Sequence, residues 1–287
     1  MSLPLVTVIC LSYNHEGYVL DALQSVLSQT YHNIQLIIID DASTDNSVSV
    51  IEGFLKTNPD VQFIKQSENI GNCKAFNSVL KFAKGDYIID LAADDILLPE
   101  RIEQGVETFE SHDEQYGINF SDAAYINEKN EVIKYHYKRD PSGTLSSYVP
   151  QGDVFKNIIQ AHFICSPTTL IKKVVFDELS GYDESLVYED FDLWVRAARN
   201  WKFCYTDHVL VQKRVLPKSH GQQQYKRGNM QMESTYQVCS KAFQLCKNKR
   251  EYAALRKRIR YELKHAIWLF KLPLSFKYFG LWIKSIH

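Results

Sequence analysis

Apolar residues in the first hundred positions form two alternating kinds of pattern. Leu5 to Leu11 is a continuous apolar run that stops at Ser12, and Ile34 to Ile39 is a second one that stops at Asp40. Continuous β-rich runs are typical of strands buried on both faces. Between the two runs, apolar residues recur at helical spacing: Val19, Leu20, Leu23, Val26 and Leu27. This order predicts a strand, a helix and a second strand.

The alternation continues with a predicted helix at 45–55, a strand at 61–65, a helix at 72–83 and a strand at 86–91. Short links between alternating strands and helices predict an α/β fold with an open, Rossmann-like, mostly parallel sheet flanked by helices. Ligands of such sheets bind beyond the carboxyl ends of the strands, where this chain places its polar clusters, among them Asp94-Asp95.

After Pro99 the order becomes mixed. The patterns predict a helix at 100–110, two strands within 117–137, a surface loop at 139–152, a short helix at 153–161 and a strand at 168–171. Tyr188-Glu189-Asp190 then leads into a further helix. Because no internal repeat or second core pattern occurs earlier, we expect one catalytic domain at 1–229 and a helical extension at 230–287.

The composition, with 45% hydrophobic and 23% charged residues among 287, is that of a globular protein. The sequence has neither an apolar run long enough to span a membrane nor the features of a signal peptide, so we expect a cytoplasmic location. The six cysteines lack CxxC spacing and lie mostly in apolar runs, which indicates reduced core residues.

The charge is asymmetric, because residues 241–287 hold twelve Lys or Arg and two Glu. The predicted helix in this tail has one apolar face, formed by Leu255, Ile259, Leu263, Ile267 and Phe270. The tail therefore suits peripheral contact with anionic lipid at the inner face of the cytoplasmic membrane. Packing onto the catalytic domain, or onto a sister subunit in a homo-oligomer, explains the same pattern equally well. Nucleic-acid binding is disfavoured because the rest of the chain is acidic.

Asp94-Asp95 is the first candidate for chemistry. Adjacent side chains of extended backbone point to opposite faces, so one carboxylate can bind a metal and the other a sugar hydroxyl. A nucleotide diphosphate needs such an oxygen site, since Mg²⁺ or Mn²⁺ is bound by one or two carboxylates plus phosphate oxygens. Taken alone, the pair also fits a helix cap or a solvated turn.

Six segments in order, between Leu3 and Val215, resemble the family 2 glycosyltransferases, which are inverting enzymes of the GT-A fold. The segments are Leu5–Asn14, Leu27–Tyr31, Ile37–Ser47, Glu68–Asn77, Ala83–Asp95 and Tyr188–Arg196. The resemblance implies transfer of a sugar from a nucleotide-diphosphate donor, typically a UDP-sugar, to a hydroxyl of a glycan or polyprenyl-linked glycan. A role in bacterial surface-polysaccharide synthesis is also implied.

The resemblance assigns roles by position. It implies that donor nucleotide binding involves Leu11, Tyr13, Asp40, Asp41, Ser43, Lys74 and Asp94. Tyr13 and Asp41 would contact a uracil-type base, and Asp95 would bind Mn²⁺ or Mg²⁺ bridging the diphosphate. A local helix cap formed by Asp40, Asp41 and Ser43 is compatible with these roles.

Asp190 is the catalytic base by the same resemblance. Inversion by single displacement needs a carboxylate that takes the proton of the attacking hydroxyl. The predicted helix begins near Asp190, and a helix N-terminus favours the ionised form that a base requires. Glu189 and Asp190 could also merely stabilise that helix. Asp192 is the weaker candidate nearby.

Two positions depart from the family pattern. Phe76 stands where relatives commonly have Arg, and Lys74 is the residue that could compensate. Relatives also often have a basic residue or His near the phosphates or the metal, for which the candidates are Arg214, Lys218 and His220.

Other classes remain to be weighed. The departure at Phe76 is compatible with a non-catalytic binding or scaffold protein of the same fold. The presence of all four key aspartates argues against that alternative: Asp41, Asp94, Asp95 and Asp190. A sugar nucleotidyltransferase would need a glycine-rich basic loop, and residues 11–17 do not form one. The motifs of dinucleotide-binding and P-loop enzymes do not occur. The donor sugar and acceptor cannot be identified from these patterns.

Overall fold

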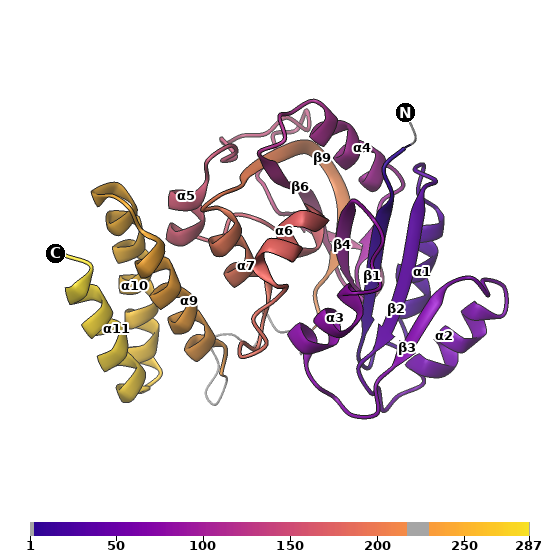
Figure 1. The fold of residues 1–287 in the computed structure, drawn as a ribbon, viewed down its shortest axis with the longest axis horizontal. Helices are drawn as coiled ribbons and strands as arrows, with labels where there is room; N and C mark the ends of the chain where they lie inside the picture. Colours follow the sequence, from indigo (N-terminus) through magenta and orange to yellow (C-terminus); the bar gives the residue numbers. More distant parts are fainter. Residues whose placement is uncertain (1–2, 217–229, 287) are drawn as a thin grey trace.

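The computed structural model describes residues 3–216 and 230–286. A single curved sheet lies between layers of helices, and three further helices extend from one side (Figure 1). In the described residues the sheet has nine strands in the order β3-β2-β1-β4-β8-β6-β9-β5, with β7 paired to β6.

The first half of the chain forms the parallel part of the sheet. Its elements are β1 (Val6–Ser12), α1 (Val19–Leu27), β2 (Ile34–Asp40), α2 (Ser47–Leu55), β3 (Gln62–Lys65), α3 (Asn72–Leu80) and β4 (Tyr87–Ala92). β1 pairs in parallel with both β2 and β4, and β2 with β3. The predicted alternation is confirmed, and the carboxyl ends of these strands meet at one edge.

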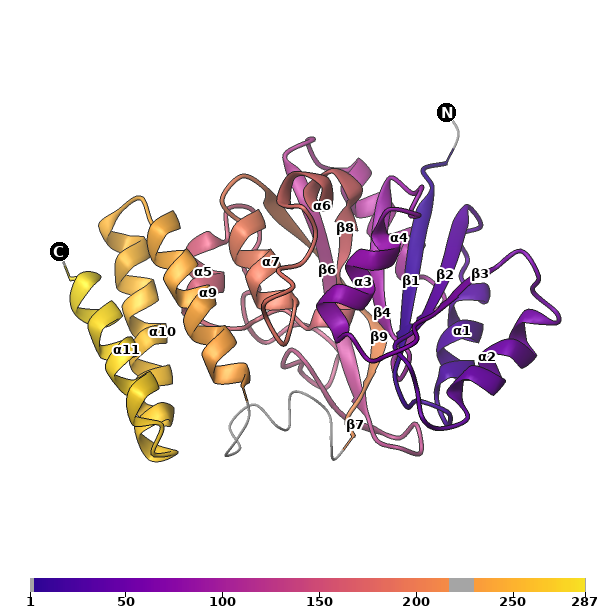
Figure 2. The ribbon, with the colours of Figure 1, turned by 60° about the horizontal axis from the view of Figure 1, so that its bottom comes forward.

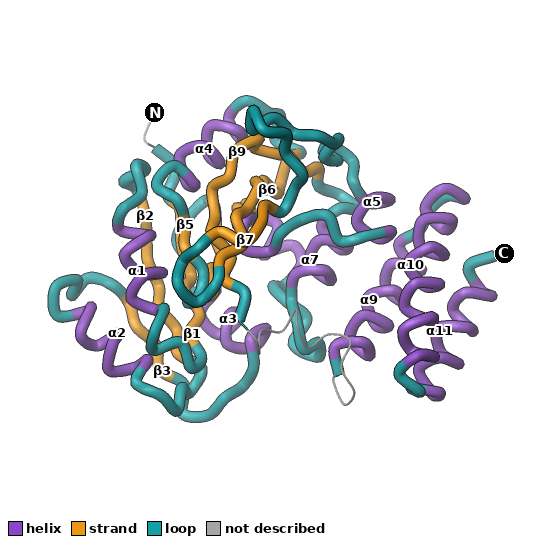
Figure 3. Tube along the Cα trace, turned by 180° about the vertical axis from the view of Figure 1, so that it is seen from behind, coloured by secondary structure: helices purple, strands orange, loops and turns teal. Residues whose placement is uncertain are grey.

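The second half adds a mixed part. It comprises β5 (Ile96–Leu97), α4 (Arg101–Glu110), β6 (Tyr116–Ile126), β7 (Val132–Tyr135), α5 (Phe155–Gln160), the 3₁₀ turn η1 (Ser166–Thr168), β8 (Leu170–Lys172), α6 (Lys173–Leu179), α7 (Asp190–Ala197) and β9 (Lys202–Arg214). β8 is antiparallel to both β4 and β6. β9 pairs in parallel with β6, and the two strands lie side by side (Figure 3). β9 therefore ends at the same edge as β1 and β4.

Each face of the sheet has its own core, because strand side chains alternate between faces. Val6, Val8 and Cys10 of β1 pack with α1, α2 and α4, whereas Ile9 packs with α3, α6 and α7 on the other face. All six cysteines are buried and unpaired, as the sequence predicts.

Three C-terminal helices follow: α9 (Gln231–Leu245), α10 (Lys249–Trp268) and α11 (Leu272–Lys284). α9 packs against α7 and α10 against α5, and α11 is outermost (Figures 1 and 2). Leu255 and Ile259 belong to the same buried cluster as Ile9 of the sheet. In the apolar face predicted for the tail, Leu255 and Ile259 are thus covered by protein and Leu263 is partly buried, whereas Ile267 and Phe270 are exposed.

Within the described residues, every helix is too short or too polar to cross a membrane.

Candidate active site

Two loops at the carboxyl edge of the sheet hold each other by reciprocal hydrogen bonds. The backbone N–H groups of Asn14, His15 and Glu16, after β1, donate to Ser43 Oγ, Ser47 Oγ and Asp45 Oδ2 at 2.8, 2.8 and 3.0 Å. In return, Asn14 Oδ1 accepts from the N–H of Thr44, and Glu16 Oε2 accepts from that of Asn46, both at 2.8 Å. We call these two segments the paired loops.

Asp40 and Asp41 lie at the start of the second paired loop, and both are buried. Asp40 accepts hydrogen bonds from the N–H and hydroxyl of Ser43 at 2.8 and 2.6 Å. These bonds close a turn in the loop, and the predicted helix cap is wrong because α2 begins only at Ser47, with Asn46 as its N-cap. Asp41 does not share that turn. Its two oxygens accept from the N–H groups of Ile70 and Gly71, each at 2.9 Å, and so tie β2 to the start of α3.

The other residues predicted to bind the nucleotide surround this edge. Tyr13 is 40% exposed directly after β1, and Leu11 is partly buried on the strand. Lys74 is exposed on the first turn of α3 and makes no hydrogen bond or ion pair with the other predicted residues. The structure brings Tyr13 and Asp40 to one edge but leaves Lys74 in solvent.

Asp94 and Asp95 follow β4, as predicted. Asp95 is buried, and its Oδ1 accepts a 2.8 Å hydrogen bond from the N–H of Arg214. Burial, and then the charge of Asp94, raise the pKa of Asp95 above its usual value. Asp94 is less buried, and its Oδ1 lies 4.0 Å from Nε2 of His15 in the first paired loop.

Arg214 is the only predicted phosphate-side candidate within the described residues, because Lys218 and His220 lie outside them. Its Nε donates to the carbonyl of Asp94 at 2.9 Å and its Nη1 to Asn130 Oδ1 at 2.6 Å. The guanidinium carbon lies 4.5 Å from the ring centre of Tyr18. Nη2 is buried and has no hydrogen-bond partner.

Asp190 is the first residue of α7, and its Oδ1 accepts from the N–H of Phe191 at 2.6 Å. Burial raises its pKa, and the charge of Lys213 opposes this rise, as does a hydrogen bond with Ser166. Asp190 is therefore partly buried, close to a cation, and at a helix N-terminus.

Lys213 is a site residue that the sequence analysis missed. It lies on β9 opposite Tyr125 of β6. Burial alone would lower the pKa of Lys213, but the neighbouring Cys165, Asp95, Tyr125 and Asp190 raise it above its usual value. One ammonium thus interacts with both Asp95 and Asp190. The available signal was a lysine two positions after the apolar run Val209 to Val211.

Two further acids were not predicted as site residues. Burial, followed by the charge of Asp190, raises the pKa of Asp90 and that of Glu189. The hydroxyl of Tyr182 donates to Asp90 Oδ2 at 2.9 Å, and Nδ2 of Asn72 donates to Glu189 Oε2. The edge is therefore rich in carboxylates that repel one another.

Asp192, the weaker candidate for the base, has a structural role. It is buried, and it pairs with Arg196 and Lys241, with both N–O distances at 2.6 Å. Lys241 belongs to α9, so this carboxylate connects α7 to the C-terminal helices.

Phe76 is fully buried and faces away from solvent in an aromatic cluster. Its ring centre lies 5.4 Å from that of Phe176 and 4.6 Å from that of Tyr182. Packing explains this departure from the family pattern.

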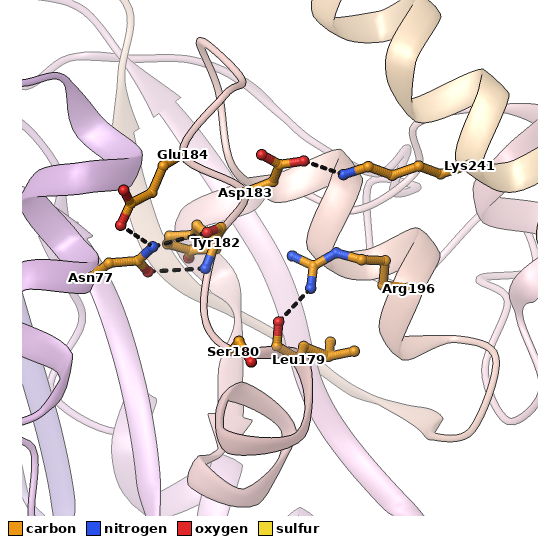
Figure 4. A pocket seen from close by; sticks show the side chains of 8 residues that line it. All are labelled: Asn77, Leu179, Ser180, Tyr182, Asp183, Glu184, Arg196 and Lys241. Carbon is orange, nitrogen blue, oxygen red and sulfur yellow. Dashed lines mark hydrogen bonds and ion pairs between the residues drawn. The ribbon is translucent and has the colours of Figure 1, made fainter.

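A separate polar pocket of about 430 Å³ opens between α3, α6, α7 and α9 (Figure 4). Its polar side chains bind one another: Asn77 donates to the carbonyl of Tyr182 and to Glu184, and Lys241 pairs with Asp183. These groups need no ligand to be satisfied.

A divalent metal is implied by the resemblance. Among the described residues, no three His, Cys, Asp or Glu side chains are grouped to bind a metal by themselves. Asp95 nevertheless fits a cation that takes its other ligands from a diphosphate, because its Oδ2 accepts no hydrogen bond in the described chain and its buried charge needs compensation.

The fold and this carboxylate-rich edge together are those of a sugar-transferring enzyme, and the comparisons specify the family. Residues 7–180 match the family described as Glycosyl transferase family 2. The chain belongs to this family and is a glycosyltransferase.

Named relatives agree with this assignment. An uncharacterized glycosyltransferase of Methanocaldococcus jannaschii is 28% identical over 223 residues, covering 75% of this chain and 72% of the relative. One of Rickettsia typhi is 29% identical over 213 residues, covering 74% of this chain and 64% of the relative.

Solved structures support the fold. S. aureus TarS 1-349 in complex with UDP-GlcNAc has a TM-score of 0.70 at 18% identity, covering 98% of this chain and 79% of that one. The mannosyltransferase PcManGT of Pyrobaculum calidifontis, in complex with GDP-Man and Mn²⁺, has a TM-score of 0.62 at 17% identity, covering 100% and 82%. The architecture is the GT-A fold.

Proposed function

We propose that the enzyme transfers a sugar, with inversion, from a nucleotide-diphosphate donor, most simply a UDP-sugar, to a hydroxyl of a glycan or lipid-linked glycan. The observation that supports this best is the shared neighbour Lys213, which interacts with Asp95 after β4 and with Asp190 at the start of α7. In the proposal, the metal-binding acid and the base would thus share one cationic neighbour, although the two acids are far apart in sequence.

In this proposal the paired loops bind the nucleotide. Tyr13, whose ring is exposed, and Asp41 would contact the base, and Asp40 with its partner Ser43 would lie close to the nucleoside. The side-chain carboxylate of Asp94 would face the ribose or donor sugar. The domain at 1–229 would thus contain the whole donor site, with 230–287 as its helical extension.

Asp95 would hold Mn²⁺ or Mg²⁺ together with the diphosphate. When bound, the cation stabilises negative charge on the departing diphosphate. The charge of Lys213 favours the ionised forms of Asp95 and Asp190, because it opposes the rise in pKa that burial causes in both.

Asp190 would accept the proton of the attacking acceptor hydroxyl. Its raised pKa brings it closer to neutrality, which strengthens it as a base while Lys213 limits the shift. Two structures of similar fold, one in complex with UDP-GlcNAc and one with GDP-Man and Mn²⁺, support the proposal of a nucleotide-sugar donor and a divalent cation.

The test is a panel of UDP- and GDP-sugars assayed for hydrolysis with and without Mn²⁺. We expect one donor to be hydrolysed faster than the rest, with stimulation by Mn²⁺ and loss of activity in EDTA. Binding of nucleotide sugars without any turnover, in the presence of glycan acceptors, would contradict the enzymatic proposal and favour a binding protein of the same fold.

A further inference from the structure

The turn between α10 and α11 bears a concentration of exposed apolar side chains. Nine of the 21 large apolar side chains exposed in the described chain lie within residues 261–286. Five of them, including Phe270 in the connection itself, are within about one helical turn of the α10–α11 connection. We call the four that lie on the two helices the hairpin tip: Ile267, Trp268, Leu272 and Phe276. Their exposed fractions are 55, 71, 58 and 75%.

The hairpin is held rigidly behind this tip. Leu274, Tyr278 and Leu281 of α11 are buried, and the hydroxyl of Tyr278 donates to the carbonyl of Met232 in α9 at 3.2 Å. Lys271, in the turn itself, pairs with Glu233 at 3.1 Å. The tip therefore stays apolar and exposed because the other face of each helix is already used for packing.

The exposed charges of the hairpin itself have one sign, and Glu233 of α9, which reaches the turn, is paired with Lys271. Lys264 precedes the tip on α10, and Lys277 follows it on α11, and both are exposed. The two carboxylates in residues 249–286 do not offset them, because Glu251 and Glu262 are buried and paired with Arg199 and Arg258. The described part of this hairpin therefore presents apolar groups and cations, without an exposed carboxylate.

We propose that the hairpin tip inserts into the interface of an anionic lipid membrane. Trp and Phe favour the headgroup region, and Lys is attracted by anionic headgroups. A second copy of the chain would need to bring carboxylates against Lys264 and Lys277, or to cover the tip with a matching apolar surface. Because the hairpin exposes bulky aromatic side chains and cations but no carboxylate of its own, a lipid surface is the favoured partner.

The placement of the tip gives this contact a direction. The α10–α11 turn lies at the same end of the molecule as the carboxyl ends of β1 and β4 (Figures 1 and 2). Membrane contact through the tip would turn the carboxylate-rich edge toward the lipid surface. Given the proposed function, this orientation favours an acceptor that is anchored in the membrane.

The test is flotation of the full chain with vesicles of phosphatidylcholine, with or without phosphatidylglycerol. We expect binding to the anionic vesicles, reduced by high salt, and roughly tenfold weaker binding when Trp268→Ser and Phe276→Ser are combined. Lys264→Gln with Lys277→Gln should weaken binding to anionic vesicles alone. Tyr148→Ser is the matched control, since Tyr148 is 79% exposed on a distant loop.

Trp268 supplies a direct readout, because its fluorescence should shift to shorter wavelength on vesicle binding. Absence of wild-type binding, or equal binding by the Trp268→Ser, Phe276→Ser variant, would overturn the proposal. A wild-type dimer that this variant converts to monomer, without vesicle binding, would assign the tip to a second copy. Asp190→Asn should bind vesicles normally, so that failure of membrane binding and failure of the catalytic proposal are separate results.

Discussion

Asp95 accepts a 2.8 Å hydrogen bond from the backbone N–H of Arg214, which is 119 positions later in the chain. The bond forms because β5 pairs antiparallel with β9, with Leu97 opposite Val211. One oxygen of the carboxylate is thereby fixed, and the other accepts no hydrogen bond in the described residues. A carboxylate held in this way is oriented before any cation arrives.

Asp95→Asn tests the metal assignment, because the amide oxygen can still accept from Arg214 while the charge is lost. We expect Mn²⁺ to stop increasing affinity for the nucleotide diphosphate, measured by calorimetry with and without Mn²⁺. Asp94→Asn is the matched control and should keep a Mn²⁺-dependent increase. If Asp95→Asn retains the full effect of Mn²⁺, the metal is bound elsewhere.

Asp190→Asn tests the base. We expect kcat to fall by roughly 10²–10⁴-fold, the usual contribution of a general base, while donor affinity stays near that of the wild type. Asp192→Asn, two residues away, should reduce stability and leave kcat near that of the wild type. It removes a buried partner of Arg196 and Lys241, so thermal unfolding should show a loss on the order of 2–3 kcal/mol with activity per folded molecule retained. A wild-type rate in Asp190→Asn would exclude it as the base.

Lys213→Met tests the electrostatic link. The charge of Lys213 lowers the pKa of Asp190, so its removal should raise that pKa and move the acidic limb of the pH profile of kcat to higher pH. Lys213→Arg should restore the profile. Lys202→Met on the same strand removes a surface pair with Asp113 and a contact with the ring of Tyr116, and it should leave the profile unchanged. An unshifted limb in Lys213→Met would show that Lys213 does not act on the base.

Glu189→Gln tests repulsion among the acids. Because burial raises the pKa of Glu189 in the folded state, its contribution to stability is lost as pH rises from about 4 through the folded pKa. Gln avoids that loss, so the variant should be more stable than the wild type by roughly 1 kcal/mol near pH 8 and equal to it near pH 4.

Glu251→Gln is the control of opposite sign. Burial alone would raise the pKa of Glu251, but hydrogen bonds from Arg199, Lys247 and Asn248 and the charge of Arg199 together lower it. This carboxylate therefore stabilises the fold above about pH 4. Glu251→Gln should therefore be less stable than the wild type near pH 8, and the difference in stability should be smaller at acidic pH. Thermal unfolding at several pH values measures both variants, and parallel behaviour of the two would contradict the assigned signs.

The parallel half of the sheet could be predicted from the sequence because each strand there is a continuous apolar run followed by polar residues. Asp40, Asp94 and Asp190 could be placed for the same reason, since they mark the ends of strands or the start of a helix. Such local signals depend on neighbouring residues only, and the structure agrees with them.

The remaining site features depend on distant pairing. Lys213 is buried near Asp95 and Asp190 because of the register of β9 with β6 and β5, which periodicity does not reveal. The carboxylate of Asp41 accepts hydrogen bonds from the backbone N–H groups of Ile70 and Gly71, about thirty positions away. The apolar face of α10 was visible in the sequence, but whether protein or lipid covers Leu255 depends on where α5 lies.

The paired loops restrict how this enzyme could be redesigned for another nucleotide. Each loop supplies acceptors for the other's backbone N–H groups, as between Asn14 and Thr44 or Glu16 and Asn46. A graft that replaces one loop alone would leave several of these donors without acceptors. We therefore expect that specificity for the nucleotide base can be transferred between relatives only when both paired loops are exchanged together.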